Sequence, residues 1–181
     1  RLDKATSGLV LCAKTKLAAV GASRAFAERR VKKRYSAVLL GEPGTRRGVI
    51  DAPVPVNKDG TPVPRPAQTV FAVERTVASL KAPGRALSLV ACAPKTGRTH
   101  QLRRHFAEAL DCPIVGDTLY DGGGPEARNF RRRGLFLCAR SLELDHPVTG
   151  ARLRVTTPLP DKFRSLLARE SSRAAALGAS R

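Results

Sequence analysis

The centre of the predicted sheet is the stretch Arg34-Tyr35-Ser36-Ala37-Val38-Leu39-Leu40-Gly41. After its first residues this stretch is apolar on both of its alternating faces, whereas a strand with one face in water alternates between apolar and polar side chains. A strand buried on both faces lies in the middle of a sheet, with a neighbour on either side. We therefore take residues 34–41 as a central strand and assign the other elements outward from it.

Two elements are predicted before this strand. Residues 8–14, Gly-Leu-Val-Leu-Cys-Ala-Lys, form a short apolar run that is typical of a buried strand. A helix is expected at about residues 16–30, which are rich in alanine and basic toward the C-terminal end. Thr15 precedes this helix, and a threonine side chain can accept a hydrogen bond from a free N–H group of the first turn.

The region directly after the central strand is rich in turn residues. Residues 42–66 contain an Asp59-Gly60 pair and many prolines. We expect an exposed excursion with little regular structure beyond a short strand near residues 48–54. Strand-like segments follow at 68–77 and 86–93 on either side of a Pro-Gly turn, and then a helix near residues 98–110.

The C-terminal part predicts a hairpin and a short helix. The runs 135–145 and 151–155 flank His-Pro-Val-Thr-Gly, which is a turn sequence. A helix is expected near 161–169, and the chain from Ser171 is expected to fray. Many strands and two or three helices, not in strict alternation, indicate an α+β fold with a mixed, largely antiparallel sheet. We assign residues 1–169 to one domain and residues 170–181 to a basic, flexible tail.

The charge of the chain is its strongest bulk property. It carries 33 Lys and Arg residues against 15 Asp and Glu residues, a formal net charge of +18. A field of that sign attracts polyanions, and nucleic acid is the commonest of them. An anionic membrane surface is the competing interpretation, but no segment pairs a clean apolar face with a basic one. We therefore expect nucleic acid as the partner and no membrane.

The cysteines indicate a reducing compartment. They are widely spread and form no Cys-x-x-Cys pair, so neither a zinc ribbon nor a redox motif is indicated: Cys12, Cys92, Cys112 and Cys138. Reduced core cysteines fit this spacing better than a disulfide framework. No apolar run approaches the ~20 residues that cross a bilayer, and the N-terminus does not have the pattern of a signal peptide.

Asp3 is the first candidate for chemistry, in the opening segment Arg1-Leu2-Asp3-Lys4-Ala5-Thr6-Ser7-Gly8. Short hydroxyl side chains and glycine allow the backbone to bend tightly and to hydrogen-bond locally. The residues alone fit a loop with a solvated aspartate, since most loop aspartates have no chemical role. A catalytic carboxylate is the alternative.

A second group of candidates lies at residues 94–105, Pro-Lys-Thr-Gly-Arg-Thr-His-Gln-Leu-Arg-Arg-His. On a helix, Leu102 and Phe106 share one face and Arg103 lies at its margin, so Arg103 is placed to reach a partly buried cleft. Arg104 lies farther round, toward solvent or a phosphate. The alternative is a solvated basic helix. A metal site is not indicated, because the two histidines lack the i, i+4 spacing and no carboxylate cluster accompanies them.

Tyr35 is the third candidate, at the start of the central strand and directly after Lys32-Lys33-Arg34. It is either a strand aromatic that caps the core or a platform for a nucleic-acid base. The only other tyrosine is Tyr120. A later cluster fits a solvated face or phosphate contacts: Arg128, Arg131, Arg132 and Arg133.

Together these segments resemble the RluA-type family of pseudouridine synthases, in the family's order across about residues 1–167. The matching segments are Arg-Leu-Asp-x-x-Thr-Ser-Gly-Leu at 1–9, Lys-Arg-Tyr-x-Ala at 33–37, Thr-Gly-Arg-Thr-His-Gln-Leu-Arg at 96–103, Pro-Ile-x-Gly-Asp-x-x-Tyr at 113–120, Leu-x-x-x-His-Pro at 142–147 and Pro-Leu-Pro near 158–160. The first is that family's catalytic motif, the second its tyrosine motif, and the third and fourth form its third motif.

The resemblance implies an enzyme that isomerises uridine in RNA to its C-glycoside without cofactor or metal. Asp3 would be the essential carboxylate, and Arg103 would pair with it, keep it ionised and orient it. Tyr35 would pack against the target base and assist removal of the C5 proton. Arg1 would enter the stack that the flipped-out nucleotide leaves. The other implied substrate or RNA contacts are Thr6, Ser7, Gly8, Arg98, His100, Gln101 and Arg104.

The resemblance also implies a pseudouridine-synthase-like fold for residues 1–169, a monomer, and structured rRNA or tRNA as the partner. Together with the reduced cysteines, it indicates the cytoplasm or an organelle with its own RNA, and not secretion. Neither the motifs nor the charge specify which uridine is modified.

Two departures from the family pattern bear on these expectations. The chain has no methionine and starts after the family's usual histidine and an earlier strand region, so we expect a fragment or processed product, N-terminally incomplete. Cys138 stands where the family usually has a histidine, which we expect to alter packing rather than chemistry. A non-catalytic RNA-binding module is one alternative, against which the three catalytic candidates together argue. An aspartate-nucleophile hydrolase would need a second carboxylate where Ala5 stands.

Overall fold

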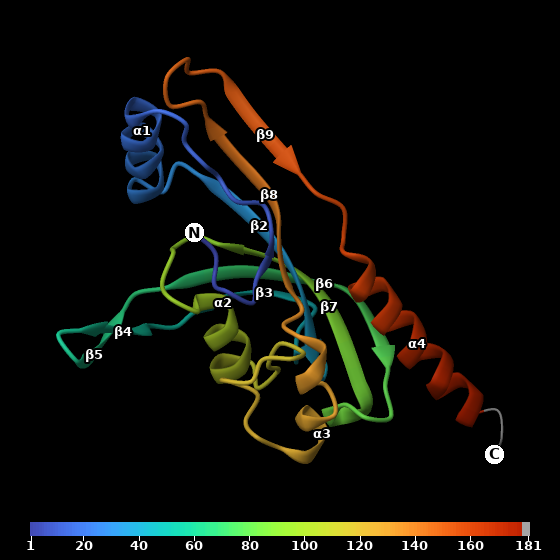
Figure 1. Cartoon of the computed structure of the whole chain (residues 1–181). Coiled ribbons are helices and arrows are strands. Elements are labelled where there is room, and N and C mark those ends of the chain that lie inside the picture. Colours follow the sequence, from blue (N-terminus) through green and yellow to red (C-terminus); the bar gives the residue numbers. More distant parts are fainter. Residues whose placement is uncertain (179–181) are drawn as a thin grey trace.

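One mixed β-sheet forms the body of the computed structural model, which describes residues 1–178 (Figure 1). Its seven strands are β1 (Ser7–Gly8), β2 (Lys32–Leu40), β3 (Arg47–Asp51), β6 (Gln68–Ala78), β7 (Ala86–Pro94), β8 (Leu137–Asp145) and β9 (Arg152–Thr156). They lie in the order β1-β8-β2-β7-β6-β3, and β9 pairs with β8. All these pairings are antiparallel except that of β1 with β8. The expected α+β fold with a largely antiparallel sheet is confirmed.

The strand β2 lies at the centre of the sheet, as its apolar pattern predicted. It pairs with β7 along one edge and with β8 along the other. Residues 37–40 are each no more than 1% exposed, so the strand is buried on both faces. The register between β2 and β8 shifts between Arg34 and Tyr35. Such irregularities re-aim side chains and are common next to active sites.

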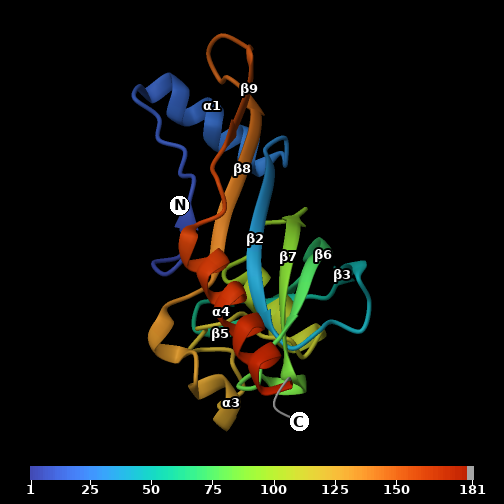
Figure 2. The same cartoon turned by 90° about the vertical axis from the view of Figure 1, so that its right-hand side faces the viewer.

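Helices cover both faces of the sheet (Figures 1 and 2). They are α1 (Lys16–Ala27), α2 (Gln101–Arg104), α3 (Pro125–Arg128) and α4 (Asp161–Gly178), and a π-helical turn over His105–Ala109 continues α2. The α4 helix runs across one face, where Phe163 is fully buried, and Phe106 of the π-helical turn is fully buried on the other. Thr15 caps α1 as predicted, because its Oγ1 accepts a hydrogen bond of 3.2 Å from the N–H of Ala18.

The α4 helix continues past residue 169, where the short predicted helix was expected to end. Glu170 is only 1% exposed and accepts a hydrogen bond of 2.8 Å from the hydroxyl of Ser79, next to β6. This contact extends the packing of the helix along the sheet, and the expected fraying from Ser171 is wrong for residues 171–178. Residues 179–181 lie outside the described residues. The boundary between the domain and a basic tail stays a prediction.

The apolar run at residues 8–14 is not a buried strand. Only Ser7 and Gly8 pair with β8, and the chain then continues as an irregular segment. Val10 is 55% exposed and Leu11 is 37% exposed. The positive φ of Gly8, 106°, ends the extended conformation that pairing requires.

The proline-rich excursion is more regular than expected. After β3 it forms a two-stranded hairpin of β4 (Val54–Lys58) and β5 (Thr61–Arg65), which projects from the body in Figure 1. Asp59 and Gly60 both have positive φ, 52° and 85°, which is the conformation of a tight type I′ hairpin turn. The predicted turns between β6 and β7 and between β8 and β9 are confirmed as well.

Candidate active site

A cleft of about 480 Å³ brings together side chains from parts of the chain that are far apart in sequence. Its lining residues are Arg1, Leu2, Asp3, Thr6, Phe26, Lys33, Tyr35, Pro94, Thr96, Gly97, Arg98, Thr99, His100, Gln101, Leu102, Arg103 and Leu137. All three predicted catalytic residues are among them, and so are five of the eight predicted contact residues. Ser7, Gly8 and Arg104 lie outside the lining. The volume is in the range of small-ligand sites.

Asp3 is held in the cleft by a loop that is fastened to β8. The N–H of Thr6 donates to the carbonyl of Asp3 at 2.8 Å, which closes a turn. The hydroxyl of Ser7 donates to the carbonyl of Leu137 at 3.2 Å. Gly8 approaches β8 so closely that a Cβ atom there would lie 2.2 Å from the carbonyl oxygen of Ala139. Ser7 and Gly8 therefore position the loop, while the carboxylate of Asp3 stays 28% exposed and accessible to a ligand.

His100 links Asp3 to Tyr120. Its Nε2 lies 3.9 Å from Oδ2 of Asp3, and its Nδ1 lies at hydrogen-bond distance, 2.9 Å, from the hydroxyl of Tyr120. The backbone of His100 is left-handed, with φ 54°, a conformation that residues with a side chain rarely adopt. The helix expected from residue 98 therefore begins only at Gln101, and strain of this kind is often found at functional sites.

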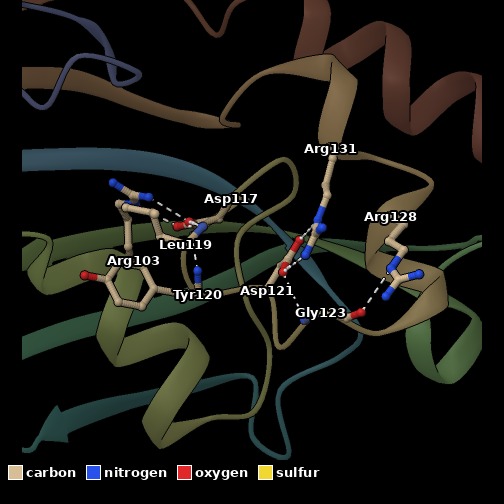
Figure 3. A network of polar contacts seen from close by, with 8 residues as sticks. All are labelled: Arg103, Asp117, Leu119, Tyr120, Asp121, Gly123, Arg128 and Arg131. Atoms are coloured by element: carbon tan, nitrogen blue, oxygen red, sulfur yellow. Dashed lines mark hydrogen bonds and ion pairs between the residues drawn. The ribbon is translucent and has the colours of Figure 1, made fainter.

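Arg103 is buried in the wall of the cleft, but its partner is Asp117 rather than Asp3 (Figure 3). The Nε and Nη2 of Arg103 donate to the two carboxylate oxygens of Asp117, each at 2.7 Å. This hydrogen bonding, followed by the negative charges of Asp117 and Asp3, raises the pKa of Arg103 against the opposing effect of burial. The expected direct pairing with Asp3 is thus absent among the contacts described for residues 1–178, and Asp3 acts on the guanidinium through its charge.

Asp117 and Tyr120 support Arg103 from outside the lining of the cleft (Figure 3). Oδ1 of Asp117 also accepts hydrogen bonds from the backbone N–H groups of Leu119 and Tyr120, at 3.0 and 3.2 Å. The guanidinium groups of Arg103 and Arg104 lie 5.1 and 4.8 Å from the centre of the Tyr120 ring. Neither Asp117 nor Tyr120 was among the predicted site residues. The Gly-Asp-x-x-Tyr segment at 116–120 was the signal that pointed to them.

Tyr35 lies in β2 directly after the register shift, and its side chain is partly buried in the cleft wall. Burial, and then the negative charges of Cys92 and Asp3 in their ionised forms, raise the pKa of Tyr35 to about 12. The side chain therefore remains a neutral phenol at physiological pH. It presents an apolar ring and one hydroxyl to the cleft.

Three other predicted contacts have partners within the protein. Gln101 is buried, accepts hydrogen bonds from Thr96 and from the N–H of Arg98, and donates to Gln68 and Thr69. All four contacts are internal, so Gln101 braces the turn that carries His100. Arg98 and Arg104 lie at the surface, where Arg98 donates to the carbonyl of Pro66 and Arg104 pairs with Glu108.

The described part of the chain contains no cluster of three or more side chains suited to holding a metal ion. No helix within residues 1–178 is long and apolar enough to cross a membrane. All four cysteines are free; three of them, Cys138 included, are buried, and Cys12 is exposed.

Comparison with known proteins identifies the family. Residues 1–108 match the family model of RNA pseudouridylate synthases. The dual-specificity RNA pseudouridine synthase RluA of Escherichia coli is 38% identical over 165 residues, which cover 87% of this chain and 71% of that protein. The ribosomal large subunit pseudouridine synthase D of Nitrosomonas europaea is 36% identical over 178 residues. The aligned part covers 92% of this chain but only 49% of that relative.

Solved structures agree with this assignment. The human RNA pseudouridylate synthase domain containing 1 has a TM-score of 0.73 and 34% identity, over 87% of this chain and 66% of that one. The human RNA pseudouridylate synthase domain containing 4 has a TM-score of 0.74 and 30% identity, over 93% of this chain and 73% of that one. The match in sequence, in fold and over most of the chain shows that the protein belongs to the RNA pseudouridylate synthase family.

Proposed function

We propose that this chain isomerises uridine to pseudouridine in structured RNA, either rRNA or tRNA, with Asp3 as its catalytic carboxylate. The observation that carries the proposal is the convergence of Asp3, Tyr35 and Arg103 on one cleft. Membership of the family supports the reaction, and the name of the ribosomal large subunit synthase D supports rRNA as a substrate. The net charge of +18 favours binding of a polyanion.

The reaction is an isomerisation, so its atoms balance without any further reactant. The bond between C1′ of the ribose and N1 of uracil breaks, the base turns, and a bond forms between C1′ and C5. The proton on C5 leaves, and N1 gains one. The protein therefore has to supply a reactive carboxylate, a site that holds the detached base, and groups that move a proton.

Asp3 has the surroundings that a reactive carboxylate needs. It is partly exposed to the cleft, and its loop is fixed by Ser7 and Gly8. A cationic guanidinium in the same cleft attracts a carboxylate and can orient it. Arg103 supplies that charge, and Asp117 holds the guanidinium in place. In this proposal Arg103 acts on Asp3 through its field, and its hydrogen bonds fix its position.

Tyr35 is assigned to packing against the target base. A side chain that accepts the C5 proton would have to be a phenolate, and the raised pKa of Tyr35 keeps it protonated. Its ring can stack on the base and its hydroxyl can donate a hydrogen bond. The proton-accepting role that the resemblance implied is therefore less favoured than the packing role.

Access to C1′ and C5 requires that the nucleotide leave its stack. Arg1 lies at the cleft and is exposed, so it is placed to enter the vacated space. Asp3, Tyr35 and Arg103 already meet within a single copy of the chain, and we propose a monomer as the functional unit.

The proposal is tested with RNA that contains 5-fluorouridine. We expect a covalent adduct of reduced gel mobility with the wild type and none with Asp3→Asn, because fluorine at C5 blocks the final proton loss. Tritium release from uridine labelled at C5 measures turnover on ordinary RNA. RNA binding without adduct or turnover, in this chain and in a version extended at its N-terminus, would favour the non-catalytic RNA-binding module instead.

A further inference from the structure

A second cavity, of about 270 Å³, lies beside the active-site cleft. It is lined by Phe26, Ala27, Arg29, Val31, Lys33, Lys95, Thr96, Gly97 and Arg98. These residues come from the end of α1, the start of β2 and the turn after β7. Phe26, Lys33, Thr96, Gly97 and Arg98 also line the active-site cleft, so the two cavities share a wall.

The lining of the second cavity contains four cationic side chains and no carboxylate: Arg29, Lys33, Lys95 and Arg98. The nearest acidic residue in the sequence, Glu28, is engaged elsewhere, because it accepts hydrogen bonds from Arg24 at 2.8 Å and from Arg30 at 2.7 Å. Arg98 contacts a carbonyl oxygen, that of Pro66. The cations of this cavity are therefore gathered without an anion of the described chain to balance them.

Lys33 is the side chain that this imbalance affects most. Its Nζ lies 3.4 Å from the carbonyl oxygen of Thr96, which is a long hydrogen bond, and burial lowers the pKa of its ammonium group. A carbonyl dipole offsets only part of the cost of removing a charge from water. An anion in the cavity would stabilise the charged form of Lys33 and offset the repulsion among the four cations.

We propose that the second cavity binds a phosphodiester group of the RNA strand, on a nucleotide that flanks the target uridine. The proposal rests on the function proposed above, because the shared wall places the cavity next to the cleft that would receive the base. Several cations around one concave site suit a phosphate, whose oxygens can accept several charge-assisted hydrogen bonds. A contact of this kind carries no sequence information. It fixes the register of the strand and hence which nucleotide faces Asp3.

Arg29 and Lys95 are the residues to change, because both are exposed and line only the second cavity. The double variant Arg29→Gln/Lys95→Gln removes one arginine and one lysine charge. Its matched control, Lys81→Gln/Arg169→Gln, removes the same two charges at exposed positions between β6 and β7 and on α4. The dissociation constant for rRNA and tRNA transcripts is measured over a series of salt concentrations. Every variant is also made in the Asp3→Asn background, so that binding is tested independently of turnover.

The Arg29→Gln/Lys95→Gln protein, the cavity variant, is expected to bind RNA more weakly. The salt slope, which is the slope of the logarithm of the binding constant against the logarithm of the salt concentration, should be smaller in magnitude by about 1, as loss of one phosphate contact predicts. Its kcat/KM should fall, and the control should differ less from the wild type in both measures. The conservative pair Arg29→Lys/Lys95→Arg should restore the slope. Equal slopes for the cavity variant and the control would overturn the proposal, whether or not Asp3 proves catalytic.

Inorganic phosphate separates the RNA backbone from a free anion as the ligand. If phosphate raises the Tm of the wild type but not of the cavity variant, while the RNA salt slope is the same in both, the cavity serves a free anion and the assignment to RNA is wrong. A reduced slope in the cavity variant supports the RNA assignment with or without that effect of phosphate.

Discussion

Arg103 and Asp117 are joined by two hydrogen bonds of 2.7 Å, and both side chains are buried, that of Arg103 in the lining of the cleft that also contains Asp3. The guanidinium is thus fixed before any RNA enters the cleft. Asp117 is itself held by the backbone N–H groups of Leu119 and Tyr120. A catalytic charge that needs no rearrangement at the moment of reaction is more effective than a mobile one.

The Arg103–Asp117 pair is expected to behave as one unit in stability measurements. Arg103→Met or Asp117→Leu alone leaves one buried charge unpaired and should lower the free energy of unfolding by about 3–5 kcal/mol. The double variant Arg103→Met/Asp117→Leu should lose clearly less free energy of unfolding than the sum of the losses in the two single variants. Part of its loss arises because two backbone N–H groups no longer have an acceptor. Urea denaturation of the wild type, the two single variants and the double variant gives the interaction free energy between the two side chains. Additive losses would mean that the two side chains do not stabilise each other.

Arg103→Lys tests the catalytic side of the same arrangement. Lysine keeps the charge but cannot form the two-pronged contact with Asp117, so we expect kcat to fall by at least about tenfold while RNA affinity changes little. Arg104→Lys is the control, because Arg104 contacts the same Tyr120 ring but lies at the surface and pairs with Glu108. A large loss of affinity with intact turnover would place Arg103 among the RNA-binding arginines.

Gly8→Ala should displace the loop that carries Asp3. Gly8 has φ 106°, and a Cβ there would lie 2.2 Å from the carbonyl oxygen of Ala139. We expect a loss of at least about 1–3 kcal/mol of stability, and a loss of turnover larger than that instability explains. Gly44→Ala is the control, since no heavy atom lies within 4 Å of a Cβ at that position. Its stability should change by less than about 0.5 kcal/mol.

Tyr35 should make the protein sensitive to alkaline pH. Its pKa is raised from 10.0 to about 12, so between these values the folded state holds a proton that the unfolded state has lost. Stability therefore falls as pH rises through this window, by up to about 3 kcal/mol. Tyr35→Phe should lack this component, which chemical denaturation at a series of pH values would reveal. Parallel curves of the free energy of unfolding against pH for the wild type and Tyr35→Phe would show that the Tyr35 phenol is not desolvated.

The features that could be predicted from sequence are those that depend on neighbouring residues. The burial of β2 follows from its unbroken apolar run, the start of α1 from Thr15, and the β8–β9 hairpin from its turn sequence. The convergence of Asp3 and Tyr35 followed from the order of the motifs, since no local pattern brings them together.

The features that sequence reasoning missed depend on contacts between distant segments. The run at 8–14 has the composition of a strand, but only its first residue, Gly8, pairs with β8, together with Ser7 before it. The family resemblance implied that Arg103 pairs with Asp3, and spacing alone could not place the loop that carries Asp117 beside Arg103. The π-helical turn after Arg104 buries His105, whose ring nitrogens contact Thr69 and the carbonyl of Ala52, which an ordinary helical period does not predict.

The prolines of the β4–β5 hairpin have a consequence for how the protein behaves among other copies of itself. In a two-stranded ribbon, alternate residue pairs turn their N–H groups outward, where a further strand could dock. Proline fits only at such positions, so the outward pairs are Pro55 with Pro64 and Asn57 with Pro62. Three of these four positions therefore carry no N–H group. The ribbon can project far from the body and still offer neighbouring molecules almost no template on which to build an aggregate.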